Sequence, residues 1–200
     1  MSRTRLMAIT IAPIAVILVA ILIINLLTNT DRALDEARRD MASMVATLSE
    51  RFDGELRRVA QVAEQTGRAV TVLSHRRPLT EDETYSLLDN GVLQDPLIYG
   101  AAMAFVAGGF ESRPAYSPYV YRNGVIPDSL SRLDIAGAYD YLNDPEVRWY
   151  ADPMKTGRPV WSEPYFDEGA GNIMMSTYSV PFVGPDGQPL GVTTIDIPLR

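Results

Sequence analysis

The stretch that decides the fold is "IMMSTYSVPFVGPDGQPLGVTTIDIPL", residues 173–199. Residues 173–183 and 190–197 are rich in the β-branched and aromatic residues that favour strands. The segment between them contains Asp186-Gly187, a pair typical of a tight hairpin turn. The stretch therefore predicts two antiparallel strands of one sheet.

Further strands are expected on the N-terminal side of this hairpin. One covers about residues 160–165 and is joined to the hairpin by "DEGAGN". "LIYGAAMAFVAGGF", residues 97–110, has the pattern of a strand and a turn, and "YVYRNGVIP", residues 119–127, that of a strand turning at Asn123-Gly124. The sequence thus predicts about five antiparallel strands.

Two short helices are predicted between these strands and the N-terminal part of the chain. Thr80 and Glu83 form a capping box, and the helix that they open is expected to end at Asn90-Gly91. In "NDPEVRWYADPMKTGRP", Asp144 is the expected N-cap, with Pro145 at the first helical position and a stop at Pro153.

A much longer helix is predicted before them. Apolar residues recur at steps of three and four from Leu34 to Leu73, which forms one apolar stripe on a helix. An unbroken helix from Asp31 to Ser74 would be roughly 66 Å long. Gly54 and Gly67 each weaken it by ~1 kcal/mol relative to alanine and are candidate bends. A long helix, short helices and an antiparallel sheet make an α+β fold.

Leu6–Leu27 holds no charge and would span about 33 Å as a helix, enough for the hydrocarbon core of a membrane. Arg3 and Arg5 precede it, and acids follow it from Asp31 on. We therefore expect residues 1–5 in the cytoplasm, 6–27 across the membrane and about 31 onward outside. The alternative is a cleaved signal peptide, whose apolar core is only ~7–15 residues long and is followed by a small-x-small site that is not found here.

The composition excludes several classes of site. The net charge of −7 makes nucleic acid a poor partner. The sequence contains no cysteine, and its single histidine, His75, is expected to be exposed at a helix end. No phosphate-binding loop or nucleophile elbow occurs, so neither a cofactor nor catalysis is expected.

"WSEPYFDEGAGN", residues 161–172, concentrates rings and acids. As a continuous strand it would place Trp161, Glu163, Tyr165 and Asp167 on one face. Glu163 and Asp167 would then be ~13 Å apart. That distance is too large for the carboxylate pair of a glycosidase, which is separated by ~5–9.5 Å. The loop also lacks the ligand pattern of an EF-hand.

Three residues of this region suggest ligand binding. Tyr165 and Asp167, ~6.6 Å apart on one face, suit an organic cation. The alternative is a rim tyrosine followed by a solvated acid. Asp196 lies in the apolar strand "GVTTIDIPL", and a buried carboxylate needs a partner: an arginine, a backbone amide or the amine of a ligand. The alternative is an exposed or internally paired aspartate.

"IYGAAMAF", "SPYVYRNG", "VRWYADPMKTGRPVWSEPYFDEGAGNIMMSTYSVPF" and "GVTTIDIPL" resemble Cache domains, the PAS-like extracytoplasmic sensors of bacterial receptors. The closest likeness is to double Cache sensors that precede metal-dependent protein serine phosphatases. Similar sensors also precede diguanylate cyclases, histidine kinases and chemotaxis transducers. The resemblance implies a stalk and dimerisation helix over 31–75 and a membrane-distal sensor lobe over 76–200. It also implies a second lobe and an output domain beyond this chain.

The same resemblance implies a set of ligand-binding residues. Trp149, Tyr150, Tyr165, Asp167 and Asp196 resemble the residues that hold a ligand's amine. The arginine and tyrosine that hold a ligand's carboxylate in the family fall on Val147 and Leu142 here. Arg148 and Tyr141 are their neighbours, so recognition of an amine is better supported than recognition of an α-carboxylate.

We therefore expect a sensor in the bacterial inner membrane that binds an amine or amino acid, forms a homodimer through its stalk helix and is not itself an enzyme. Two alternatives stay open. Trp161 with Glu163 would suit an anchored carbohydrate-binding or carbohydrate-active protein, and a sheet without a cavity would suit a scaffold whose helix only oligomerises.

Overall fold

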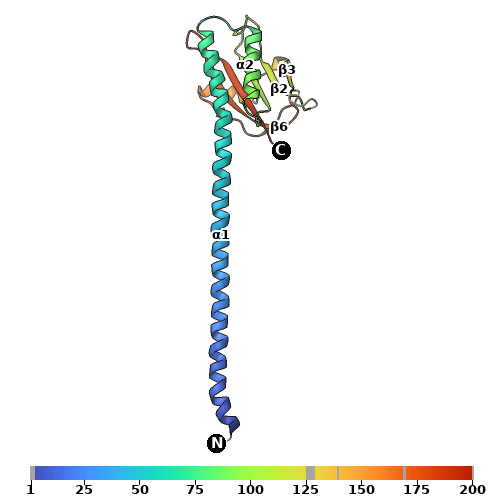
Figure 1. Cartoon of the computed structure of the whole chain (residues 1–200). Helices are drawn as coiled ribbons and strands as arrows, with labels where there is room; N and C mark the ends of the chain where they lie inside the picture. The colour runs from blue at the N-terminus through green and yellow to red at the C-terminus, as the bar shows by residue number, and fades with distance from the viewer. Residues whose placement is uncertain (1–2, 125–128, 139, 169, 200) are drawn as a thin grey trace. The chain divides into compact units, whose positions relative to one another are not determined.

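The computed structural model describes residues 3–124, 129–138, 140–168 and 170–199 (Figure 1). The helices are α1 (Arg3–Ser74), α2 (Glu81–Leu93), the 3-10 helix η1 (Ile135–Gly137) and α3 (Arg148–Thr156). The strands are β1 (Gly100–Phe105), β2 (Pro118–Arg122), β3 (Leu130–Asp134), β4 (Val160–Trp161), β5 (Tyr165–Phe166), β6 (Met174–Val183) and β7 (Pro189–Pro198). This confirms the predicted α+β class.

The chain divides into two compact units, residues 1–54 and 55–200. Within the first unit, residues 3–54 belong to helix α1. Among the described residues, α1 is the one helix with an apolar stretch long enough to cross a membrane. The large apolar side chains described between residues 14 and 52 are exposed, including Leu22, which is 70% exposed, and Met44, which is 66% exposed. Helical structure continues through Gly54 and Gly67, so neither glycine interrupts it.

The second unit is built on one antiparallel sheet, with strand order β3-β2-β1-β7-β6-β4 and with β5 also paired to β6. The β6–β7 hairpin is its centre and confirms the prediction from residues 173–199. Gly187 adopts a φ of 75°, and the Gly184 amide donates to the Gln188 carbonyl at 2.9 Å, which closes the turn. Asp196 on β7 lies opposite Gly100 on β1 and Thr177 on β6, so it is at the middle of the sheet.

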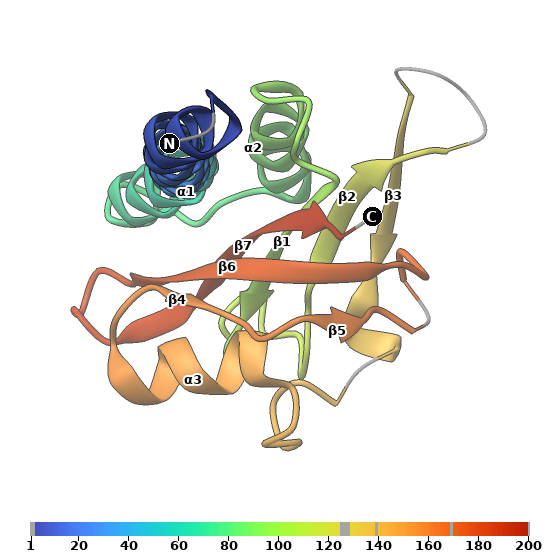
Figure 2. The same ribbon diagram turned by 90° about the horizontal axis from the view of Figure 1, so that it is seen from below.

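Helices cover both faces of the sheet (Figure 2). Residues 55–74 of α1 and helix α2 pack on one face, where Val59, Ala63 and Leu88 form a core with Ile195 of β7. Helix α3 and η1 pack on the other face, where Tyr141, Trp149 and Tyr150 lie in a second core. The two cores are therefore separated by one layer of strands.

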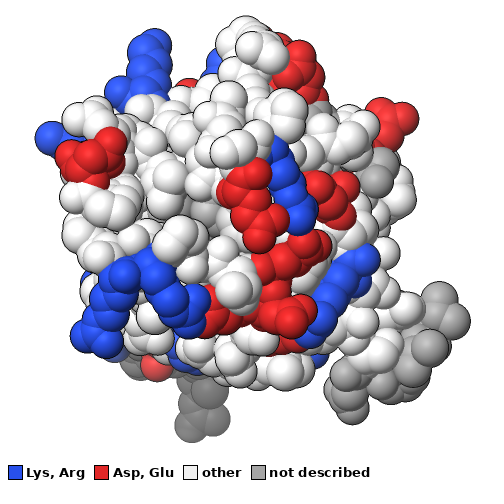
Figure 3. Space-filling model, turned by 90° about the horizontal axis from the view of Figure 1, so that it is seen from above, with Lys and Arg blue, Asp and Glu red and all other residues white. Residues whose placement is uncertain are grey.

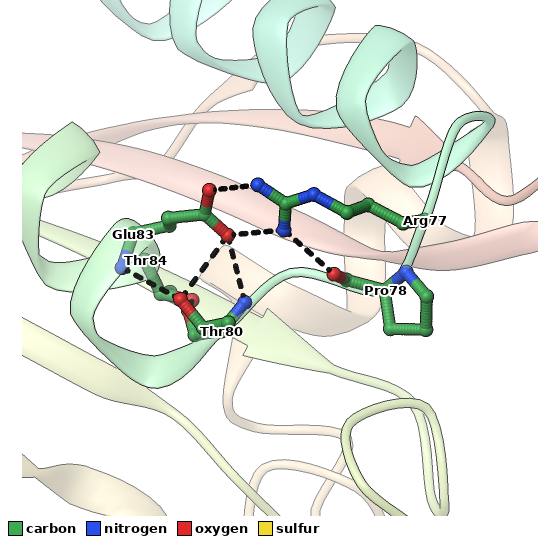
Figure 4. A network of polar contacts seen from close by, with 5 residues as sticks. All are labelled: Arg77, Pro78, Thr80, Glu83 and Thr84. Atoms are coloured by element: carbon green, nitrogen blue, oxygen red, sulfur yellow. Dashed lines mark hydrogen bonds and ion pairs between the residues drawn. The ribbon is translucent and has the colours of Figure 1, made fainter.

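The predicted capping box at the start of α2 is confirmed (Figure 4). The Glu83 amide donates to the Thr80 hydroxyl at 3.3 Å, and the Thr80 amide donates to the Glu83 carboxylate at 3.0 Å. Hydrogen bonds from Arg77, and then from the Thr80 amide, lower the pKa of Glu83 to about 2. The helix continues past Gly91 to Leu93, contrary to the predicted end, because Val92 is fully buried against the core.

Helix α3 begins three residues later than predicted. Asp144 does not cap it: its carboxylate accepts from the Glu146 amide at 2.9 Å and so holds a separate turn. The helix opens at Arg148 and includes Pro153, whose buried ring lies inside it, contrary to the predicted stop. It ends at Gly157, which adopts the left-handed φ of 65° that ordinary residues avoid.

The strand predicted over 160–165 is two short strands, β4 and β5, with a break at residues 162–164. Trp161 lies opposite Tyr178 and Tyr165 lies opposite Met175. Between these two pairs, residues 162–164 face residues 176–177 of β6, so three residues oppose two, which is a bulge of one residue. Because side chains alternate, the extra residue places Trp161 and Tyr165 on opposite faces, and the predicted shared face is wrong.

One further difference from the prediction lies at the other edge of the sheet. Strand β3 was not predicted; its residues are partly exposed, because the strand lies at the sheet edge beside β2 alone. The chain reverses between Arg122 and Leu130, as the predicted turn requires, but residues 125–128 lie outside the described part. On the face seen in Figure 3, acidic side chains lie among lysine and arginine side chains.

Candidate functional site

A cavity lies on the face of the sheet that α3 covers, and we call it the inner cavity. Its walls combine two carboxylates, three rings, two hydroxyls and four apolar side chains. The lining residues are Asp167, Asp196, Tyr119, Trp149, Tyr165, Thr177, Thr194, Ala102, Ile135, Ala170 and Met175. About 260 Å³ of space lies between these atoms, including the part open to solvent. A sheet face without a cavity would have favoured the scaffold alternative, so the cavity gives that alternative no support.

Asp196 is the most buried charged group of this cavity, with 2% of its surface exposed. Burial raises the pKa of its carboxyl group to about 7. The Thr177 hydroxyl, which donates to Asp196 Oδ1 at 2.8 Å, opposes the rise, and the nearby charge of Asp167 adds to it. Among the described residues that line the cavity, none is basic, so no arginine or lysine neutralises Asp196.

A short chain of hydroxyl groups connects Asp196 to Tyr165. The Tyr165 hydroxyl lies 2.8 Å from Thr177 Oγ1. A threonine hydroxyl has one proton, and in Thr177 that proton points to Asp196 when the carboxylate is ionised. Tyr165 must then donate to Thr177, so the two hydroxyls and the carboxylate form one chain of hydrogen bonds. The sequence prediction that Tyr165 and Asp196 belong to one site agrees with this arrangement.

Asp167 lies just after β5 and is 3% exposed. Its Oδ2 accepts from the Gly171 amide at 2.5 Å, and its own amide donates to the Ile173 carbonyl at 2.9 Å. Gly171 is required here, because a Cβ at this position would lie 2.8 Å from the Tyr99 ring and 2.9 Å from Asp167 Oδ2. The loop therefore fixes the carboxylate of Asp167 in the cavity wall rather than in solvent.

Tyr119 is a cavity residue that the sequence analysis missed. It is 2% exposed, and its hydroxyl has no hydrogen-bond partner of good geometry among the described residues. It lies close enough to Asp196 to lower the pKa of that carboxyl group. Burial raises the pKa of Tyr119 well above its ordinary value, so the phenol keeps its proton. Buried hydroxyls are normally hydrogen-bonded, and the group that Tyr119 faces inside the cavity is the carboxyl of Asp196.

The other residues that were predicted to bind the ligand lie in three different places. Trp149 lines the inner cavity. Tyr150 lies behind it in the second core, in an edge-on contact with Tyr141 at 4.8 Å, and burial raises its pKa to about 12. The Tyr141 hydroxyl donates to the Phe105 carbonyl at 2.8 Å. Tyr141 and Tyr150 thus support Trp149 rather than line the cavity.

Arg148 lies at a second, wider space, which we call the outer cavity. Its lining residues are Glu146, Val147, Arg148, Trp149, Ser162, Glu163, Pro164 and Tyr165. Trp149 and Tyr165 line both cavities, so the two spaces adjoin at these residues. Trp161 is in neither: its ring packs on Tyr178 at 5.0 Å, on the face that carries α1 and α2.

This chemistry suits recognition of a cation. Two buried carboxylates and three aromatic rings, two of them phenols, converge, which provides charge, cation–π attraction and hydrogen bonds at one place. Within the described residues, no group of three His, Asp or Glu side chains could hold a metal ion.

Solved structures with this fold come from signalling receptors. The extracellular domain assigned to the histidine kinase soHK1S-Z6 is 32% identical, with a TM-score of 0.54 over 74% of this chain and 61% of its own. "Methyl-accepting Chemotaxis protein X" is 17% identical, with a TM-score of 0.60 over 77% of this chain and 59% of its own. This chain therefore spans about three fifths of each. A comparison with curated proteins found no match.

The fold is that of the ligand-sensing domains of signal-transduction receptors. The profile of the methyl-accepting chemotaxis protein-like first PDC sensor domain matches residues 84–200. The chain belongs to this family.

Proposed function

We propose that this chain is the amine-sensing part of a membrane receptor. The observation that carries the proposal is Asp196, a buried carboxylate whose partner in the structure is a neutral hydroxyl. A buried charge that lacks a counter-ion is costly, and a ligand ammonium would supply the counter-ion. The carbohydrate alternative draws no support from the site, because Trp161 lies outside both cavities.

The other parts of the proposal concern the whole receptor. Residues 6–27 would cross the inner membrane, with residues 1–5 in the cytoplasm and the sensor domain outside. The exposed apolar stripe from Leu34 to Leu48 would pair with a second copy, because water-exposed apolar side chains favour association. The sequence resemblance favours a double Cache receptor whose output domain is a serine phosphatase.

A ligand screen tests the amine proposal. Thermal shifts of the full-length protein in detergent would be measured with amines, amino acids, neutral compounds and carboxylic acids. We expect amines to raise the melting temperature of the wild type. Asp196→Asn should weaken amine binding roughly ten- to a hundredfold while the protein stays folded. Stabilisation by neutral or anionic compounds alone would show that the amine assignment is wrong.

A reporter fusion tests the membrane topology. An enzyme that is active only outside the cytoplasm would be fused after Arg200. We expect it to be active, because the charges that flank residues 6–27 favour export of the following segment. The matched fusion of a reporter that is active only in the cytoplasm should be silent, and activity of that second fusion would contradict the proposed topology.

A further inference from the structure

The two cavities differ greatly in size. The inner cavity therefore limits the size of the ligand group that can enter it. The centre of a water molecule can occupy only about 10 Å³ of the inner cavity, but about 350 Å³ of the outer one. The smaller value is close to the minimum for a single water molecule. A primary ammonium group has about this size, whereas a trimethylated ammonium does not. The rest of any ligand must then lie in the outer cavity.

The polar groups of the inner cavity fit the three N–H donors of such an ammonium. The carboxylates of Asp167 and Asp196 line the cavity as acceptors, and the phenol oxygen of Tyr119 lies beside them. Tyr119 adds a second observation: its buried hydroxyl faces Asp196 but makes no hydrogen bond of good geometry within the described residues, so it can reorient toward a bound molecule.

The outer cavity carries an excess of negative charge. Glu146 and Glu163 line it together with one cation, Arg148, and all three residues are exposed. Among the described residues, no ion pair joins these three side chains to one another or to other groups. Both carboxylates are therefore available to the part of the ligand that extends past Trp149 and Tyr165.

We propose that the ligand is a linear molecule with a primary ammonium at one end and a second cationic group at the other, the class of the aliphatic diamines. The first ammonium occupies the inner cavity, the alkyl chain passes between the rings of Trp149 and Tyr165, and the second ammonium lies near Glu146 and Glu163. This inference rests on the proposed function, because it assumes that the inner cavity binds an amine.

An amino acid with a terminal amine is the main competing ligand. Its carboxylate would meet Arg148 but also both glutamates, so two of the three charges in the outer cavity would repel it. Opposite charges at exposed sites contribute little individually. The expected preference for a diamine is therefore moderate, about three- to tenfold in affinity.

Four compounds of equal chain length separate these possibilities: 1,4-diaminobutane, 1-aminobutane, 4-aminobutanoate and butyltrimethylammonium. Their affinities for the full-length protein in detergent would be measured by isothermal titration calorimetry. We expect the diamine to bind most tightly and the trimethylated compound least.

In the double variant Glu146→Gln/Glu163→Gln, affinity for the diamine should fall about three- to tenfold. Affinity for 1-aminobutane should stay unchanged. Asp82→Asn, which removes an exposed acid from α2 on the other face of the sheet, is the matched control.

Three results would overturn the inference. Tighter binding of 4-aminobutanoate than of the diamine would assign the outer cavity to an anion held by Arg148. An unchanged ratio of diamine to monoamine affinity in the double variant would show that the two glutamates do not contribute to diamine binding. In both cases the amine proposal itself survives. If none of the four compounds binds while neutral or anionic ones do, both proposals fail together.

Discussion

Replacing Asp196 with asparagine should make the unliganded protein more stable at pH 8, although the same change should weaken ligand binding. The reason is the buried charge. The carboxyl group has a pKa of about 7 in the folded protein against 3.8 in the absence of burial. It therefore binds its proton more tightly in the folded state. As pH rises from about 4 to about 7 the unfolded chain ionises first, so stability falls through this window and then stays level.

The size of the effect follows from that difference. About three pKa units at ~1.4 kcal/mol each give an upper limit of about 4 kcal/mol for the cost of ionised Asp196. Relaxation of the cavity and entry of water reduce this value, and half of it is a reasonable expectation. About 2 kcal/mol corresponds to a rise of roughly 4–8 °C in melting temperature for a domain of this size. Asparagine keeps the acceptor for the Thr177 hydroxyl and has nearly the same shape.

The assay is the melting temperature of wild type and Asp196→Asn without ligand, at pH 5 and at pH 8. We expect the variant to be several degrees more stable at pH 8 and the difference to shrink at pH 5, where the wild-type carboxyl group is mostly protonated. Asp82→Asn, on the exposed surface of α2, should show no such pH-dependent gain. A variant that is less stable than wild type at pH 8 would show that Asp196 is a structural residue and would refute the reasoning.

Two further predictions follow from other parts of the molecule. Gly171→Ala should weaken amine binding and destabilise the domain by about 1–3 kcal/mol, because its Cβ would press on Asp167 Oδ2 and the Tyr99 ring. Gly137→Ala, where the new Cβ meets nothing within 4 Å, is the control, and equal affinities for the two variants in calorimetry would contradict the prediction. Single cysteines placed along Leu34–Leu48 should crosslink between copies with helical periodicity on gels, whereas uniform absence of crosslinks would argue for a monomer.

The elements with strong local signals were predictable from the sequence. The β6–β7 hairpin carries its own turn at Asp186-Gly187, and α2 carries its own capping box. The start of α3 was wrongly predicted from Asp144, because aspartate also closes isolated turns. Its end was wrongly predicted from Pro153, because proline is tolerated in a helix where its ring packs in a core. Local sequence cannot distinguish these uses, because neighbouring elements decide between them.

The site was predictable in part for a similar reason. Asp196 is conspicuous, because a carboxylate within an apolar strand demands an explanation. Tyr119 gives no such signal, since a tyrosine in a strand is ordinary, and only the packed sheet places its buried hydroxyl beside Asp196. The bulge at residues 162–164 had no clear signal except Pro164, yet it decides which rings face the cavity.

The position of Gly67 has a mechanical consequence. A Cβ there would lie 3.2 Å from Val180 and 3.3 Å from Thr193, so α1 rests directly on β6 and β7. Thr193 is adjacent in the chain to Thr194, whose side chain lines the cavity on the other side of the sheet. A single backbone thickness therefore separates the inner cavity from the helix. Close-packed atoms do not compress, so a small displacement of β7 cannot be absorbed there, and residues 55–74 of α1 must shift with it.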